Sequence, residues 1–290
     1  METLYTESHY YIDYKFGDTL NIIPFGDIHR DTDSCDVERW KWFLKNAKLL
    51  DQSKTHYICL GDVNDFASAK EQSILKKSDL HKQTMDKLDM IVQKDNRAVA
   101  KEMSFMRDHF IGMVDGNHNW VFEDGTTAAK DLAERLNAPY LGWLSHITVH
   151  LNMFTASGRK HGSSVSLFIV ACHGRAGGKL AGSSINQVED LKRIFPIADI
   201  YVMGHDHQRG AWPVSILIPG GQDAGIKQKR QFLSRSGSFK KGYTSGVASY
   251  EVASLYRPSD LGAIQFTVSL HTQKEKNGSN RTITDIKVII

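Results

Sequence analysis

The sequence predicts a layered α/β domain with a β-rich C-terminal half. Apolar runs of strand length alternate with amphipathic helical patterns up to about residue 205, as is typical of α/β layers. Beyond that point, β-branched and apolar residues alternate between Gly, Pro and Ser. Neither an internal repeat nor a linker interrupts the chain. We therefore expect residues 1–290 to form one domain, with its β-rich part at about 211–290.

Strand-length apolar runs recur before residue 205, and each ends in a polar turn. Short apolar runs bounded by turn signals are typical of buried strands. We expect these runs to be strands of one sheet. They span residues 20–25, 56–60, 110–114, 165–171 and 200–203.

The clearest helical pattern covers residues 37–50. Trp40, Phe43 and Ala47 recur at three- and four-residue steps, so they share one face, which we expect to pack on the core. A further helix is expected over residues 127–136, because a turn signal containing proline follows it directly.

A long polar segment, about 68–109, separates the second and third runs. Its apolar residues fit one or two amphipathic helices, and its polar stretch 93–97 is a candidate break between them. This helical insertion is long enough to form a lid or a dimer surface.

The C-terminal part reads as strands that complete a second sheet packed on the first. Residues 273–281 are expected to form a solvated loop or hairpin turn between two of these strands. The predicted strands cover residues 212–218, 244–253, 263–271 and 282–290.

Composition sets limits on location and redox chemistry. No run of about 18 apolar residues is present, and the first 14 residues lack a signal-peptide pattern, so we expect a cytoplasmic protein without membrane contact. The spacing of Cys35, Cys59 and Cys172 matches no zinc or redox motif. A net charge of +3 is too small to require a nucleic-acid partner.

Each of the five apolar runs is followed by residue types that bind metals. Because the carboxyl ends of strands in an α/β sheet meet at one crevice, we expect these side chains to converge. The residues of ligand type are Asp27, His29, Asp62, Asn117, His173, His205 and His207.

Imidazole and carboxylate ligands together suit Mn, Fe, Zn or Ni, and a carboxylate can bridge two ions. Taken singly, these signals are weak. Asp27 with His29 is a pattern that occurs by chance, and a lone His173 is more often a satisfied polar residue near a core. His205 and His207, alternating after a strand, are harder to explain as a polar turn. The order of all five segments favours a two-metal centre with open positions for water and substrate.

In this order, the motifs D-x-H, G-D-x-x-D, G-N-H, H and G-H-x-H resemble the signature of the calcineurin-like metallophosphoesterases. The resemblance covers residues 20 to about 210, and the later Ser236, Gly237 and Ser238 are similar to a Gly-Ser element in that family. It assigns no subfamily. The fold that it implies is a four-layer α/β/β/α sandwich.

The resemblance also implies the cofactors and the reaction. Two divalent transition-metal ions, Mn²⁺ first and Fe, Zn or Ni as alternatives, lower the pKa of a shared water, and the bridging hydroxide attacks phosphorus in line. The ligands divide between the two ions, with one shared: Asp27, His29 and His207 for the first, Asn117, His173 and His205 for the second, and Asp62 for both.

Two further residues have catalytic roles by the same resemblance. His118 is expected to stabilise the transition state or protonate the leaving oxygen, and Asp65 to orient His118. Asn119 departs from the family pattern, because many relatives have an acidic residue there. Asp206, between the two histidines of its motif, is expected to be solvated rather than to support a ligand.

A basic segment, residues 225–246, bears on the substrate. It either tracks a nucleic-acid backbone with bases stacked on its aromatics, or forms a solvated loop that contacts nothing. Its cations are Lys227, Lys229, Arg230, Arg235, Lys240 and Lys241, and its aromatics are Phe232, Phe239 and Tyr243.

Four other residues are candidates at the crevice. Arg175 and Lys179 flank a glycine pair just after His173, where they bind a non-scissile phosphate unless the loop only reverses the chain. Trp120 and Trp143 either border the crevice or belong to the core.

The sequence thus predicts a metal-dependent phosphodiesterase acting on DNA, RNA or a nucleotide. A phosphomonoesterase is the alternative, since the same dinuclear centre serves both reactions. A non-catalytic scaffold with this fold is the third hypothesis, which the retention of all seven ligand-type residues and His118 disfavours.

Overall fold

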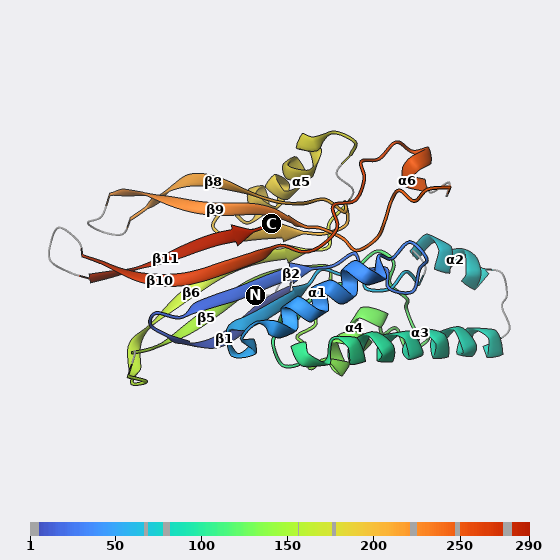
Figure 1. The fold of residues 1–290 in the computed structure, drawn as a ribbon, viewed down its shortest axis with the longest axis horizontal. Coiled ribbons are helices and arrows are strands. Elements are labelled where there is room, and N and C mark those ends of the chain that lie inside the picture. The colour runs from blue at the N-terminus through green and yellow to red at the C-terminus, as the bar shows by residue number, and fades with distance from the viewer. Residues whose placement is uncertain are drawn as a thin grey trace.

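Two β-sheets packed face to face form the centre of the computed structural model, which describes residues 6–66, 69–77, 82–155, 157–175, 178–220, 225–246, 250–274 and 280–290 (Figure 1). The six-stranded sheet has the order β1-β5-β6-β7-β9-β8, and the five-stranded sheet has the order β11-β10-β2-β3-β4. The strands of the first are β1 (Thr6–Lys15), β5 (Leu144–Phe154), β6 (Lys160–Cys172), β7 (Ile200–Met203), β8 (Arg209–Pro219) and β9 (Ile226–Ser236). Those of the second are β2 (Thr19–Phe25), β3 (Thr55–Cys59), β4 (Phe110–Met113), β10 (Gln265–Lys274) and β11 (Asn280–Ile289).

Alternating side chains from both sheets fill the space between them. Ile58 and Phe266 of one sheet and Ile147, Ile169 and Phe232 of the other belong to this core. Since successive strand residues point to opposite faces, each sheet has a second apolar face, which must be covered by helices.

Helices supply these covers. The helices α1 (Val37–Leu49), α3 (Lys82–Glu102) and α4 (Ala128–Arg135) pack on the five-stranded sheet, and α5 (Ala181–Ile194) packs on the six-stranded one (Figure 1). The fold is therefore a four-layer α/β/β/α sandwich, as expected. None of the described helices is both long enough and apolar enough to cross a membrane.

Helix α1 forms where the periodicity predicts it. Asp36 caps its first turn by accepting a hydrogen bond from the Arg39 backbone N–H at 3.0 Å. Trp40, Phe43 and Ala47 are its buried residues. Thr127 caps α4 in the same way, with the Lys130 backbone N–H as donor.

The segment 68–109 forms α2 (Ala69–Lys77) and α3, but the expected break at 93–97 is wrong. Helix α3 continues through these residues because Asn96, although polar, is buried and satisfied. Its side-chain amide donates to the Ala128 carbonyl and to Asp131, both at 2.8 Å, which fastens α3 to α4. Residues 67–68 and 78–81 lie outside the described part of the chain.

The strands that end in the five motifs do not share one sheet, so that prediction is wrong. The strands β2, β3 and β4 lie in one sheet, and β6 and β7 lie in the other. The reason is β5, which the sequence patterns did not reveal. It pairs antiparallel with β6 and so begins a separate sheet, whose strand ends meet those of the first.

The C-terminal strands are also divided between the sheets rather than forming one of their own. Strands β8 and β9 extend the six-stranded sheet, and β10 and β11 extend the five-stranded one. The predicted strand at 244–253 is wrong, because the chain turns at Gly246 (φ 77°) and forms the short helix α6 (Tyr250–Ala253). Residues 247–249 of that prediction lie outside the described residues.

A buried histidine in β3 makes the stability of the fold depend on pH. His56 is 6% exposed, and its Nδ1 is 3.2 Å from the Tyr10 hydroxyl. Burial, aided by the charge of His109, lowers the pKa of His56 to about 4 from 6.5. The unfolded chain therefore binds this proton more readily, and stability is lost as pH falls from 6.5 toward 4.

We predict that His56→Gln removes this part of the pH dependence. Between pH 7 and pH 5 the wild type should lose on the order of 1–2 kcal/mol more unfolding free energy than the variant. Urea unfolding at the two pH values measures the difference. His271→Gln, at an exposed position on β10, should behave as wild type. Equal losses in His56→Gln and wild type would contradict the prediction.

Candidate metal centre

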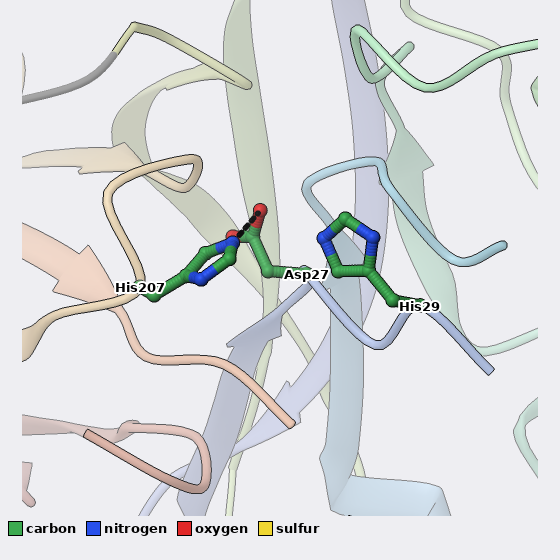
Figure 2. A group of neighbouring side chains, drawn as sticks. All are labelled: Asp27, His29 and His207. Carbon is green, nitrogen blue, oxygen red and sulfur yellow. Dashed lines mark ion pairs between the residues drawn. The ribbon is translucent and has the colours of Figure 1, made fainter. Parts of the chain in front are cut away.

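The turns after the motif strands bring all the predicted ligand-type side chains to one place. Three groups form in which the potential ligand atoms all lie within 4.8 Å of one another. Figure 2 shows the first, with the Asp27 carboxylate facing the ring of His207 and the ring of His29 beside it. The groups are Asp27, His29 and His207; Asp62, His173 and His205; and His29, Asp65 and His118.

The backbone at this site adopts a conformation that most side chains avoid. A left-handed φ is uncommon outside glycine, although Asp and His tolerate it better than most residues. Such strain persists where the surrounding structure holds it, and it clusters at functional sites. The site residues with positive φ are Asp27 (50°), His29 (48°), Asp62 (47°), His205 (72°) and His207 (56°).

Glycines in the motifs make room for the carboxylates of Asp62 and Asp27. A Cβ atom on Gly116 would lie 1.9 Å from Oδ1 of Asp62, and one on Gly204 would lie 2.8 Å from Oδ2 of Asp27. Only glycine allows such a close approach, so any other residue at these two positions would displace a carboxylate.

Asp62 lies between histidines of two different groups. Its Oδ1 accepts a hydrogen bond from the backbone N–H of His118 at 2.9 Å. Its Oδ2 is 3.2 Å from Nε2 of His173 and 3.9 Å from Nε2 of His29. One carboxylate oxygen is thus anchored, and the other faces both histidines.

The tautomer of His173 follows from its contact with a carbonyl. Nδ1 lies 2.6 Å from the Leu60 carbonyl oxygen, which can only accept, so Nδ1 donates. In the neutral ring Nε2 then carries a lone pair. This lone pair faces Oδ1 of Asn117 at 2.8 Å and Nδ1 of His205 at 3.0 Å, in addition to Asp62. In that neutral form, Nε2 of His173 faces two other acceptors, Asn117 Oδ1 and the Asp62 carboxylate, and a proton on Nε2 or a metal ion between them removes the conflict.

The first group contains a similar conflict. Nδ1 of His29 donates to Asp65 Oδ2 at 3.0 Å, which leaves the lone pair on Nε2. That Nε2 and Oδ1 of Asp27 are buried and have no hydrogen-bond partner among the described residues. Nε2 of His207 lies 3.6 Å from the same Asp27 oxygen. Buried polar atoms are nearly always satisfied, so the orphaned atoms fit a bound cation.

Burial controls protonation at the site. It raises the pKa of Asp27 to about 6, and, together with the charge of His173, it lowers the pKa of His205 to about 4. Burial also holds the pKa of His207 well below its ordinary value, so His205 and His207 are neutral and their lone pairs are available. For His173, the charge of Asp62 outweighs burial and raises the pKa to about 9. A proton or a metal ion can therefore occupy this position.

The donor set fits transition metals. Imidazole nitrogens, carboxylates and an amide oxygen suit Mn, Fe, Zn and Ni. The residues that could hold two ions are those that the sequence singles out, and Asp62 is the one that faces both groups.

Asp65 contacts two histidines, which its sequence spacing does not reveal. One oxygen binds Nδ1 of His29 and the other contacts Nδ1 of His118. Although burial opposes it, hydrogen bonds from His118 and His29 hold the pKa of Asp65 well below its usual range. Burial likewise opposes the raised pKa of His118, which its hydrogen bond to Asp65 and the charge of Asp62 outweigh. Lys240 Nζ lies 3.6 Å from Asp65 and adds a cation at this place.

Two motif-adjacent residues have structural partners. Asn119 donates to Asp115 at 2.5 Å and accepts from the Ala129 backbone N–H at 3.0 Å, so it fastens the start of α4. The expectation that Asp206 is solvated is wrong. Its carboxylate contacts Ser184 and lies 3.5 Å from Nε of Arg235, whose side chain is fully buried.

The basic segment 225–246 is not one exposed surface. Strand β9 takes up half of it, and Phe232, Arg235 and Phe239 are buried. Lys229 pairs with Asp199 at 2.9 Å. Its members therefore do not form one continuous surface, because strand alternation and the core divide them, and contact of the exposed ones with nucleic acid stays a prediction.

The remaining candidates lie as follows. Arg175 is exposed and pairs with Asp190 at 2.8 Å, and Lys179 lies over the ring of Tyr256 at 5.9 Å. Trp120 is buried, whereas Trp143 is 45% exposed and packs against His173.

Comparisons with known proteins leave the family open. No protein-family model and no curated protein sequence matches the chain. Among solved structures, Vps29 of Chaetomium thermophilum matches at 13% identity and a TM-score of 0.34, over 93% of this chain and 96% of that one. A predicted phosphoesterase of Streptococcus pneumoniae matches at 12% and 0.32, over 92% and 99%. GAP50, the anchor in the inner membrane complex of Plasmodium, matches at 12% and 0.39, over 91% and 88%. Similarities this low decide neither family nor activity.

We predict that Gly116→Ala weakens metal binding without unfolding the protein. The added methyl would collide with Asp62 and displace the carboxylate that faces both histidine groups. Perturbing the support of a ligand typically costs about 10- to 100-fold in metal affinity. Calorimetric titration with Mn²⁺ measures the loss. Gly182→Ala in α5 is the control, because nothing lies within 4 Å of its Cβ. Wild-type Mn²⁺ affinity in a folded Gly116→Ala protein would refute the close-approach explanation.

Proposed function

We propose that this protein is a metal-dependent phosphoesterase of the calcineurin-like type. The observation that carries the proposal is the single carboxylate, Asp62, facing histidines of two groups, beside the buried Nε2 of His29 and Oδ1 of Asp27, which have no hydrogen-bond partner among the described residues. Such an arrangement suits two cations held close together with one shared ligand.

In this proposal the group of Asp27, His29 and His207 and the group of Asp62, His173 and His205 each hold one ion. Bound divalent ions lower the pKa of a shared water and neutralise phosphoryl oxygens. Asp62 serves both, and the others divide as the resemblance implies: Asp27, His29 and His207 hold the first, and Asn117, His173 and His205 hold the second. The Leu60 carbonyl and Asp65 orient two of these ligands by accepting from their Nδ1 atoms.

His118 is suited to act on the leaving group. Asp65 contacts its Nδ1, which fixes the proton there and leaves Nε2 as the atom that gives a proton to the leaving oxygen. The raised pKa of His118 favours the protonated ring that this role needs. General acid catalysis of this kind contributes roughly 10²- to 10⁴-fold.

The substrate is proposed to be a phosphodiester of a nucleotide or nucleic acid, with a phosphomonoester as the alternative. Because the cations of residues 225–246 do not form one surface, one reason to expect a long nucleic acid as the substrate is removed. Arg175 and Lys179 stay candidates for a non-scissile phosphate, and Mn²⁺ is the first metal to test. A scaffold that holds no metal has no need for the unpaired Nε2 of His29 and Oδ1 of Asp27 in a buried site, and this geometry therefore favours an enzyme.

A substrate panel with Mn²⁺ tests the proposal. It contains single- and double-stranded DNA, RNA, cyclic nucleotides, simple mono- and diesters, and phosphopeptides. We expect hydrolysis of at least one phosphoester that depends on added metal. A folded protein that binds no transition metal and hydrolyses nothing in the panel would refute the proposed phosphoesterase activity.

Two variants separate the metal ligands from the acid. His118→Ala should lower kcat by roughly 10²- to 10⁴-fold on a poor leaving group and keep metal binding, whereas Asp62→Ala should lose both. His271→Ala, at an exposed position, is the control. Near wild-type turnover in His118→Ala on such a substrate would show that the assigned role is wrong.

A further inference from the structure

An exposed tryptophan stands beside the proposed second metal position. In the antiparallel pair β5–β6, Leu144 lies opposite Cys172, so the next position places Trp143 opposite His173. The His173 backbone N–H donates to the Trp143 carbonyl at 3.4 Å, which continues this register past the strands. Directly opposed residues point to the same face of a sheet. Trp143 and His173 therefore project to the same side.

That side is the one on which the metal centre lies. His173 directs Nε2 toward Asn117, Asp62 and His205. The indole of Trp143 packs edge-to-face against the His173 ring, with centroids 5.4 Å apart and planes at 75°. A group attached to a phosphate beside His173 thus comes within reach of the indole.

The exposure of Trp143 calls for a partner. Large aromatic side chains are normally mostly buried, and an indole left in water forgoes favourable burial. Trp40 and Trp120 are buried in cores, and Trp42 is 58% exposed on α1. Trp143 is 45% exposed and differs from Trp42 in that its ring packs against a histidine of the site. The strand register and the His173 contact hold its backbone and ring in place, so the exposed indole surface exists before any ligand arrives.

The surroundings select the kind of ligand. The described groups that His173 contacts beside Trp143 are polar, namely Asn117 and His205, which favours a ligand with polar edges over a lipid chain. A ligand with a flat aromatic group can stack on the exposed indole, and polar edges on that group can contact the polar neighbours. Nucleobases have this character, and stacking on an aromatic side chain contributes about 1–3 kcal/mol per base.

We infer that Trp143 stacks on the base of a nucleotide substrate whose phosphate lies beside His173. The inference rests on the proposed phosphoesterase function and narrows its substrate class. It does not depend on the basic segment 225–246.

The test compares each substrate with its baseless counterpart on the Mn²⁺-loaded full chain. The pairs are a dinucleotide with its abasic analogue, and AMP with ribose 5-phosphate. Trp143→Ala should lower kcat/KM for the base-containing member by about 5- to 150-fold and leave the baseless member nearly unchanged. Trp143→Phe should keep most of the preference. Calorimetric binding of AMP should weaken in parallel in Trp143→Ala.

Trp42→Ala is the control, because Trp42 is an exposed tryptophan (58%) on α1, where it packs under Arg39. This variant should leave kcat/KM unchanged for both the base-containing and the baseless substrate of each pair. If Trp143→Ala lowers kcat/KM equally for both members of a pair, or for neither, the inference is overturned, while the proposed phosphoesterase function still stands. Failure of the wild type to hydrolyse any substrate would reject the proposed function and the inference with it.

Discussion

The placement of the Asp62 carboxylate is the constraint on which the site depends. Its side chain is 2% exposed, and an ionised carboxylate at such depth is costly unless cations and hydrogen bonds compensate it. One oxygen has the His118 backbone N–H, and the other has only histidine nitrogens. Because those nitrogens offer lone pairs when the rings are neutral, the arrangement is balanced by added positive charge. Metal ions or protons must supply it.

Much of the local structure serves this placement. Gly116 leaves room for the carboxylate, and the turns of the motif strands hold aspartates and histidines at positive φ. The packing of two sheets brings strand ends from β3 and β6 together, so that Asp62 and His173 meet from different sheets. Leu60 and Asp65, behind the ligands, fix the ring tautomers of His173 and His29. A rigid frame of this kind keeps ligand atoms close despite the cost of strain.

The sequence predicts the site better than it predicts the sheets. Ligand types in turns after apolar runs identify Asp27, Asp62 and His173 without knowledge of strand order, because strand ends converge in either arrangement. Assignment to one sheet fails because the sequence patterns do not reveal β5 as a strand: it pairs antiparallel with its neighbour β6 and, over a long sequence distance, with β1. The apparent basic patch fails because Arg235 lies in a strand whose outer half is charged and whose inner half is buried. The prediction of a solvated Asp206 fails because its partner, Arg235, lies 29 residues further along the chain, and nothing in the sequence near Asp206 indicates that contact.

The most direct test of the two-cation account is anomalous scattering from crystals of the Mn²⁺-loaded protein. The account predicts two manganese peaks with the Asp62 carboxylate in contact with both, one peak bounded by Asp27, His29 and His207 and the other by Asn117, His173 and His205. A single peak, or none, at saturating Mn²⁺ in a folded protein would contradict it.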